Sequence, residues 1–368
     1  MRIAYLSIGG HIHTIRWLRY FVERGHEVHL MTVQPSPIDG VEVHDIRTGI
    51  PLKPLHYAVA LGRVRQLLGT IRPDILHTHF LTGYGYWGAF SGFRPHVLTV
   101  WGDDVYVTPH ETRLKGWLAR RALRSADLVT GDSEDIIEHA VRMGARRDAC
   151  HVVQWGVDLD RFHIGASTTV REDLGIPPEA PVVISTRSFT QPYYNIELIV
   201  RTIPEVLERH PASRFIIAGN EGEDDDLRAL AQELGVLDSV HFVGRIPHDR
   251  LPAWLAASDV FLTVPSVDAT AVSLLEAMAA GVPVVTSNLE SAMEWVVDGE
   301  SGLAVPPEDG PALLNAIVRL IESPDLRVRL GANASDIVHE RADHRAHMAR
   351  MERLMETLLS EWRRHGGR

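Results

Sequence analysis

The feature that most constrains the fold is an alternation of short apolar runs with helix-length amphipathic segments, which occurs twice along the chain. Residues 3–8 form the first apolar run, two glycines follow it, and apolar residues then recur at helical spacing until Gly25. Strands that alternate with helices form parallel sheets with helices on both faces, so we expect an α/β protein. The expected strands are residues 3–8, 27–33, 74–77, 96–100, 127–130 and 151–154 in the first half, and residues 181–186, 214–218, 240–243, 260–264 and 282–286 in the second.

The alternation is interrupted by a polar, irregular stretch at residues 158–171. A chain of 368 residues is long enough for two domains of ordinary size. We therefore expect two doubly wound, Rossmann-like domains, one at residues 1–163 and the other at residues 164–344. Residues 345–368 should form a charged amphipathic helix that packs back toward the first domain through an apolar stripe of Met348, Met351, Leu354, Met355 and Leu358.

Charge and composition exclude several classes of protein. The net charge is -11, and it is uneven: residues 1–163 contain 19 Lys+Arg against 17 Asp+Glu, whereas residues 164–368 contain 18 against 31. Without a strongly basic domain, no nucleic-acid partner is expected. No apolar run approaches the roughly 18 residues of a membrane span, and the N-terminus lacks the pattern of a signal peptide. Together with a single cysteine, Cys150, these features predict a cytoplasmic protein.

The segment at residues 265–306 carries the most chemical information. It reads as strand, loop, helix, glycine stop and strand, with Asp268 in the loop and Glu276 in the helix. Two carboxylates there can accept hydrogen bonds from sugar hydroxyls, and free amides at the helix N-terminus favour a phosphate. An alternative is that Asp268 caps the helix and Glu276 is only solvated. The residues around that N-terminus are Thr270, Ala271, Val272, Ser273 and Leu274.

This segment closely resembles the donor-binding region of the retaining family-four glycosyltransferases, the glycosyl transferases group 1. In that family two acidic residues separated by seven others lead into Glu-Ala-Met-Ala, and Gly-x-Pro-Val and Gly-Leu-x-Val-Pro strands follow. Residues 268–306 contain these motifs with the same spacing, although Asp268 replaces the usual first glutamate. The resemblance implies a GT-B fold, with two Rossmann-like domains facing each other across a cleft. It also implies a UDP- or GDP-sugar donor, retention of the anomeric configuration, and no metal or other cofactor.

The resemblance assigns donor-binding roles residue by residue. Glu276 takes the place of the residue that holds the donor ribose, and Asp268 that of the acid near the donor sugar. Arg187 stands where the family offers an arginine to the donor diphosphate, and a guanidinium can bind phosphate through two hydrogen bonds. The family's following lysine is missing, because no lysine occurs after Lys115. The other donor candidates by resemblance are Gly9, Gly10, Asn220, Glu221, Arg245 and Ile246.

The first domain supplies candidates for the acceptor side. Trp101 stands where the family commonly has histidine; tryptophan cannot transfer a proton, but it can stack on a sugar ring or belong to the core. Asp104 keeps the family's acidic place. His11 and His13 lie in the first loop and His79 at a strand end, and imidazoles can handle protons near neutral pH. The catalytic candidates are therefore Asp268, Asp104 and His79, and the acceptor candidates are His11, His13 and Trp101.

A basic helix is expected at residues 113–124, where Lys115, Arg120 and Arg121 accompany Trp117. Such a face would suit peripheral contact with an anionic membrane, at its inner side in a cytoplasmic protein. The expected reaction transfers a sugar to a glycan, lipid-linked or small-molecule acceptor. Two alternatives stay open: a nucleotide-sugar epimerase or phosphorylase of similar shape, and a sugar-binding homologue without catalysis.

Overall fold

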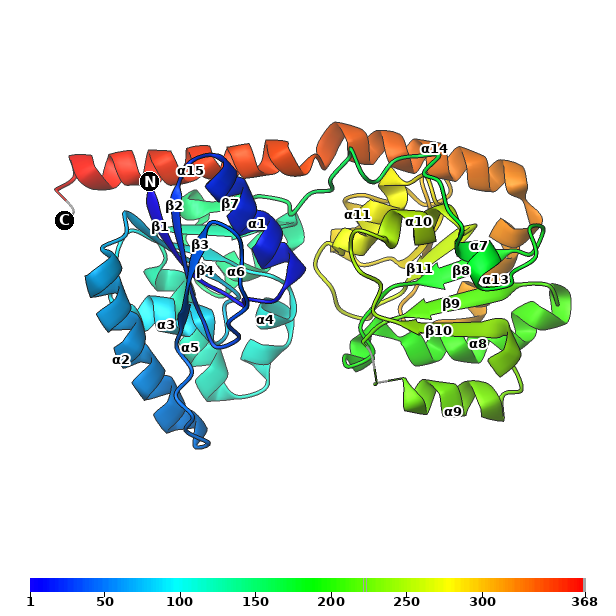
Figure 1. Cartoon of the computed structure of the whole chain (residues 1–368), viewed down its shortest axis with the longest axis horizontal. Helices are drawn as coiled ribbons and strands as arrows, with labels where there is room; N and C mark the ends of the chain where they lie inside the picture. The colour runs from blue at the N-terminus through cyan, green and yellow to red at the C-terminus, as the bar shows by residue number, and fades with distance from the viewer. Residues whose placement is uncertain (221, 223, 367–368) are drawn as a thin grey trace. The chain divides into compact units, whose positions relative to one another are not determined.

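The computed structural model describes residues 1–220, 222 and 224–366, except the side chains of residues 53 and 54, and comprises two compact units (Figure 1). Unit 1 contains Met1–Trp155 and Arg345–Arg368, and unit 2 contains Gly156–His344. Each unit holds one parallel sheet with helices on both faces, which confirms the α/β prediction. Unit 2 begins before the expected boundary at residue 163, because Val157 forms a β-bridge with Asp343 and Phe162 lies in the core of unit 2.

The sheet of unit 1 has the strand order β3-β2-β1-β4-β5-β6-β7, so the order reverses between β1 and β4. Its strands are β1 (Arg2–Leu6), β2 (Glu27–Thr32), β3 (Val41–Asp45), β4 (Ile75–His79), β5 (His96–Thr99), β6 (Leu128–Gly131) and β7 (Cys150–Val152). On one face Ala4 and Leu6 pack with residues of α2 (Lys53–Ile71) and α3 (Tyr84–Ser91). On the other face Tyr5 packs against Phe21 of α1 (Ile12–Glu23). The remaining helices are α4 (Asp103–Tyr106), α5 (Arg113–Ser125), α6 (Glu134–Arg142) and α15 (His344–Arg364).

The sheet of unit 2 repeats this plan with the order β10-β9-β8-β11-β12-β13, which reverses between β8 and β11. Alternate strand residues enter two separate core clusters, for example Phe215 on one face and Phe261 on the other. The strands are β8 (Val182–Ser185), β9 (Arg214–Ala218), β10 (Val240–Gly244), β11 (Val260–Thr263), β12 (Val284–Ser287) and β13 (Leu303–Val305). The helices are α7 (Val170–Asp173), α8 (Ile196–Arg209), α9 (Asp225–Glu233), α10 (Leu251–Ala256), α11 (Val272–Ala279), α12 (Glu290–Met293), α13 (Gly310–Glu322) and α14 (Pro324–Arg341).

The strands expected from apolar runs are all present, with small shifts at their ends. β3 was not among them, because its sequence alternates apolar residues with Glu42, His44 and Asp45 and so lacks an apolar run. This strand lies at the edge of its sheet, and among the described strands it pairs only with β2.

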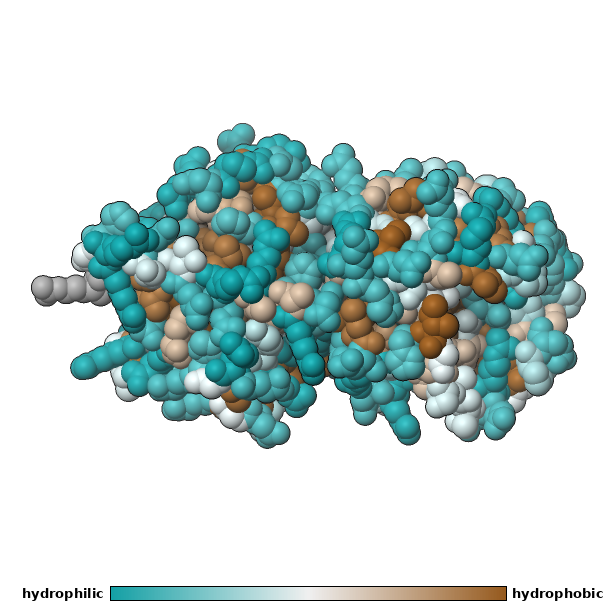
Figure 2. All heavy atoms as spheres, turned by 90° about the horizontal axis from the view of Figure 1, so that it is seen from above, coloured by the Kyte–Doolittle hydropathy of each residue, from teal (hydrophilic) through white to brown (hydrophobic). Residues whose placement is uncertain are grey.

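None of the helices in the described part of the chain combines the length and apolarity needed to cross a bilayer. Figure 2 shows a face on which hydrophilic side chains predominate and apolar ones form small separate groups.

The C-terminal helix α15 belongs to unit 1; its Met348, Met351 and Met355 are fully buried, whereas Leu354 and Leu358 are only half-buried. Its strongest polar anchor is Glu352, which is nearly buried and accepts three hydrogen bonds from the end of α1 and the turn after it. The donors are Tyr20 Oη at 3.0 Å, Arg24 Nε at 3.3 Å and His26 Nε2 at 2.7 Å. Burial by itself would raise the pKa of Glu352, but these donors outweigh it and lower the pKa, so the carboxylate stays charged.

Replacing Glu352 by alanine should therefore destabilise unit 1. The change leaves buried donors of Tyr20 and His26 without an acceptor, at a cost of about 2 kcal/mol in the free energy of unfolding. Urea denaturation monitored by tryptophan fluorescence would measure the loss. Glu356→Ala is the matched control, because Glu356 lies on the same helix but is exposed; equal stability of the two variants would contradict the role of Glu352.

Candidate active site

The predicted site residues gather at the carboxyl ends of the parallel strands in each unit. In doubly wound sheets ligands bind outside these ends, where the strand order reverses. In unit 1 this place lies after β1 and β4, and in unit 2 it lies after β8 and β11. The loop with Gly9 and Gly10 follows β1, and Arg187 follows β8.

Arg187 and Asp268 form an ion pair in unit 2. Arg187 Nη2 donates to Asp268 Oδ2 at 2.5 Å, and the two side chains are only 10% and 17% exposed. Arg187 Nη1 lies 3.4 Å from Ser273 Oγ in the first turn of α11, and the guanidinium stacks over the Tyr194 ring at 3.9 Å. A fixed cation therefore lies beside the N-terminus of α11, where the helix dipole also favours negative charge.

Glu276 is buried in α11 and pairs with His248. Its Oε1 lies 2.6 Å from His248 Nε2, and the glutamate side chain is 5% exposed. The alternative in which Asp268 caps α11 and Glu276 is solvated is wrong on both points. The N-cap is Ala271, no side chain of the described residues caps the helix, and Asp268 pairs with Arg187 instead.

His248 was missed by sequence reasoning. It follows β10, three residues after the donor candidate Arg245, and its ring also lies 5.4 Å from the ring of Phe162. A single histidine in a loop belongs to no periodic pattern, so the sequence does not indicate its contact with Glu276. That contact is visible only in the fold.

Several buried polar atoms at the carboxyl edge of the unit 2 sheet have no hydrogen-bond partner among the described residues. They are Ser185 Oγ, Thr186 Oγ1, Arg187 Nε, Thr263 Oγ1 and Ser287 Oγ. Buried polar groups are normally satisfied, because an unpaired one costs about 1–3 kcal/mol. Their concentration at the ends of β8, β11 and β12 suits an edge that receives a polar ligand.

The other predicted donor residues of unit 2 lie along the same edge. Thr270, Ala271, Val272, Ser273 and Leu274 form the loop end and first turn of α11. Asn220 follows β9, and Arg245 and Ile246 follow β10, where Gly219 N donates to Gly244 O at 3.0 Å and joins the two loops. Glu221 lies outside the described residues.

In unit 1 the predicted histidines belong to an aromatic cluster. The Trp101 ring lies 4.9 Å from His11 and 5.1 Å from Trp155, and His13 stacks on Trp155 at 5.1 Å. His11, His13 and Trp101 are half-buried, so they can reach a ligand. His79 is fully buried, and neither ring nitrogen has a hydrogen-bond partner among the described residues.

The burial of His79 limits what it can do chemically. Burial, aided by the nearby His11, lowers the pKa of His79 to about 3, so the ring is neutral at physiological pH. A neutral ring can donate and accept hydrogen bonds, and the low pKa argues against proton transfer by His79 near neutral pH.

Asp104 holds a loop together. It is fully buried, and its oxygens accept from the backbone amides of Leu81 at 2.5 Å, Trp101 at 3.0 Å and Gly102 at 2.8 Å. Burial raises the pKa of Asp104 to about 6 despite these donors. Because both oxygens face backbone amides, the structure favours a positioning role that orients Trp101 over the predicted catalytic one.

The two glycines after β1 differ in their surroundings. Gly9 is buried, its amide donates to Thr32 Oγ1 at 3.1 Å, and a Cβ there would lie 2.3 Å from the carbonyl oxygen of Gln34. Gly10 is exposed, and a Cβ there would meet no atom within 4 Å. Gly9 is therefore required by packing, whereas any requirement for Gly10 must come from a ligand.

We expect Gly9→Ala to lower the free energy of unfolding by about 1–3 kcal/mol through this overpacking. Gly10→Ala should stay within about 0.5 kcal/mol of the parent, as surface changes do. Chemical denaturation of the two variants side by side tests the contrast. A Gly10→Ala protein as unstable as Gly9→Ala would refute it.

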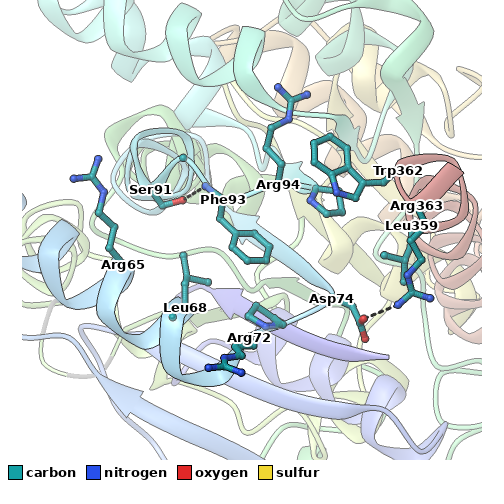
Figure 3. Close-up of a pocket in the computed structure, with 14 residues that line it drawn as sticks. Arg65, Leu68, Arg72, Asp74, Ser91, Phe93, Arg94, Leu359, Trp362 and Arg363 are labelled. Carbon is teal, nitrogen blue, oxygen red and sulfur yellow. Dashed lines mark hydrogen bonds and ion pairs between the residues drawn. The ribbon is translucent and has the colours of Figure 1, made fainter. Parts of the chain in front are cut away.

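A cavity of about 640 Å³ in unit 1 lies at the opposite end of the strands (Figure 3). Its lining includes Arg72 and Asp74 just before β4 and Arg94 just before β5. Arg363 donates to Asp74 at 2.8 Å, and Arg94 pairs with Asp127 while its guanidinium lies 5.3 Å from the Trp362 ring centre. Acidic partners thus neutralise two of its arginines, and the cavity is separate from the carboxyl-edge site.

Comparisons with known proteins agree with this geometry. The family model for glycosyl transferases group 1 matches residues 166–336, and the model for glycosyl transferase 4-like proteins matches residues 2–133. A D-inositol 3-phosphate glycosyltransferase 2 of Catenulispora acidiphila is 29% identical over 71% of this chain and 65% of that protein's length. A D-inositol 3-phosphate glycosyltransferase of Acidothermus cellulolyticus is 29% identical over 88% of this chain and 80% of its own.

Solved structures share the fold. Sucrose-phosphate synthase from Thermosynechococcus elongatus superposes with a TM-score of 0.86 at 21% identity, covering 98% of this chain and all of the other. HepE from Anabaena, in complex with UDP and glucose, superposes with a TM-score of 0.83 at 22% identity over 97% and 100%.

The two Rossmann-like units with their parallel sheets define a GT-B fold. The N-terminal part of the chain resembles glycosyl transferase 4-like proteins and the C-terminal part resembles the glycosyl transferases group 1, and the chain is a glycosyltransferase.

Proposed function

We propose that this glycosyltransferase moves a sugar from a UDP- or GDP-sugar to an acceptor hydroxyl with retention of the anomeric configuration. The observation that carries the proposal is the combination of Arg187, the uncapped N-terminus of α11 and the Glu276–His248 pair at one edge of unit 2. This edge offers a cation and a helix dipole to the diphosphate and a buried carboxylate to the ribose.

The donor is bound in unit 2. Glu276 accepts hydrogen bonds from the ribose hydroxyls, while Arg187 and the first amides of α11 bind the diphosphate. The loops with Asn220, Arg245 and Ile246 receive the base. The unpaired hydroxyls at the ends of β8 and β11 supply further hydrogen bonds once ligand is present.

The leaving diphosphate is stabilised by the protein itself and no metal is required. Arg187 and the α11 dipole face the charge that develops as the glycosidic bond breaks, as pre-organised groups do in other transferases. Asp268 keeps Arg187 in position and lies near the donor sugar. Acceptors bind in unit 1 at His11, His13 and Trp101, whose rings can stack on a sugar or polyol.

The acceptor is a glycan, a lipid-linked molecule or a small molecule. The relatives named for inositol 3-phosphate favour a small phosphorylated polyol as the first acceptor to test. The anomeric configuration of an isolated product, read from its NMR coupling constants, would reveal inversion if the retaining assignment were incorrect.

Thermal-shift screening with UDP-, GDP- and ADP-sugars tests the donor site. We expect at least one UDP- or GDP-sugar to raise the melting temperature, because a ligand that binds only the folded state stabilises it. Arg187→Lys should weaken that donor about 10- to 100-fold, since a charge-assisted bidentate contact is worth about 1.5–3 kcal/mol. Glu276→Ala should weaken it as well.

Glu205→Ala is the matched control, because Glu205 is an exposed acid of α8. Glu205→Ala should bind donor as the parent does. Absence of stabilisation by every nucleotide sugar, or equal binding by the Arg187→Lys variant, would overturn the donor assignment.

We also propose that α5 contacts anionic membranes. Leu114 and Trp117 lie one turn apart on this helix and are 66% and 54% exposed. The helix carries basic residues at 113, 115, 120, 121 and 124, and unit 1 as a whole contains 24 Lys+Arg against 18 Asp+Glu. An exposed apolar pair among cations is the pattern of an interfacial helix.

Cosedimentation with phosphatidylglycerol vesicles should detect binding that weakens at high salt. A Leu114→Ser/Trp117→Ser variant should lose most of it, while Val328→Ser, which changes an exposed valine of unit 2, should not. Equal sedimentation with neutral phosphatidylcholine vesicles would count against an electrostatic membrane contact.

A further inference from the structure

A cluster of imidazoles and carboxylates lies at the β2–β3 edge of unit 1. His29 on β2 pairs in register with Glu42 on β3, and Met31 pairs with His44. Because alternate residues of a strand face the same side, Glu27 and His29 share a face with Glu42 and His44. All four side chains therefore converge on one face, although they come from two different strands.

The atoms of three of these side chains are spaced like the ligands of one metal ion. His29 Nδ1 lies 3.2 Å from His44 Nε2 and 3.3 Å from Glu42 Oε2, and His44 Nε2 lies 3.7 Å from Glu42 Oε1. Zinc binds nitrogen and oxygen at about 2.0–2.2 Å, so neighbouring ligands of a tetrahedral ion lie roughly 3.3–3.6 Å apart. The observed spacings need only small side-chain adjustments to match that geometry.

The fourth residue, Glu27, orients the first histidine. Its Oε1 lies 3.1 Å from His29 Nε2 and accepts a hydrogen bond from Arg2 at 2.7 Å. The contacts with Arg2 and His29 hold the Glu27 carboxylate beside the Nε2 atom of His29. Because the Glu27 carboxylate accepts a hydrogen bond from Nε2 of His29, the proton stays on Nε2 and the lone pair of Nδ1 points into the cluster. Metal-bound histidines use this arrangement.

Burial differs across the three ligands in a way that suits an ion. The His29 and His44 side chains are 7% and 15% exposed, whereas Glu42 is 67% exposed. The exposed side leaves a route for the ion and room for water as a fourth ligand.

We propose that His29, Glu42 and His44 form a site for a divalent transition metal of the zinc type, with Glu27 as the group that orients His29. Imidazole and carboxylate ligands in this number suit Zn²⁺, and also Co²⁺ as its spectroscopic substitute. The ion ties the edge strand β3 to β2. β2 ends at Thr32, whose hydroxyl accepts from the Gly9 amide, so the site also braces the strand beside the first loop.

The site is independent of the proposed donor chemistry. Its ligands lie in the middle of β2 and on β3, whereas the glycosyltransferase residues of unit 1 follow the carboxyl ends of β1, β4 and β5. Metal binding can therefore be tested without an activity assay.

The test titrates the full-length protein, freed of metal by a chelator, with Co²⁺ and Zn²⁺. We expect one equivalent of Co²⁺ to give the visible absorption of a four-coordinate ion, and Zn²⁺ to displace it and raise the melting temperature. Glu42→Gln and His44→Gln should each weaken binding at least tenfold. Glu27→Gln should weaken it about 10- to 100-fold without removing a direct ligand.

His151→Gln is the control, because His151 is a half-buried histidine of β7, at the opposite edge of the same sheet. This variant should bind Co²⁺ like the parent, which separates the site from adventitious binding by the chain's 20 histidines. Circular dichroism of the metal-free variants checks that they are folded. No stoichiometric binding by the parent, or unchanged binding by folded Glu42→Gln and His44→Gln proteins, would overturn the proposal.

Discussion

The ion pair between Arg187 and Asp268 is the interaction on which the donor edge of unit 2 depends. Two charges that are 10% and 17% exposed lose much of their hydration, so each needs the other. Removing one partner would leave the other charge uncompensated near the N-terminus of α11. The pair therefore fixes the guanidinium at one position before any ligand arrives, and Tyr194 limits its movement from the other side.

Two positions that the sequence analysis singled out as differing from the resembled family contact the same guanidinium. Asp268, expected there as a glutamate, pairs with Arg187, and Tyr194, from the segment where a lysine is expected, lies under the guanidinium. The next residue, Asn195, donates to Val264 O and Ser266 Oγ and so ties that segment to the loop that carries Asp268. The variant residues thus form one group that organises a single cation.

The sequence predicted the strands and helices, because their apolar patterns repeat along the chain. It did not predict contacts between residues that are distant in the sequence. Apolar periodicity predicted both sheets, and the family resemblance predicted that Arg187, Asp268 and Glu276 belong to one donor site. β3 was not predicted because Glu42 and His44 interrupt its apolar pattern. The same two side chains form the cluster with His29. The pairing of His248 with Glu276 and the contact of Asp104 with the Leu81 amide have no signature in the local sequence, since the partners lie 28 and 23 residues away.

The net charges of the two units explain why the proposed donor binding depends on one arginine, Arg187. Unit 2 contains 13 arginines against 30 Asp+Glu and no lysine, whereas unit 1 has an excess of basic residues. An anionic donor is thus repelled by the unit proposed to bind it. Screening weakens that repulsion beyond about 8 Å at physiological ionic strength, whereas contacts within the site are screened much less. The donor binding that we propose for unit 2 therefore relies on short-range groups, namely Arg187 and the amides of α11. Without a neighbouring lysine, the guanidinium of Arg187 must be held in place by the side chains around it.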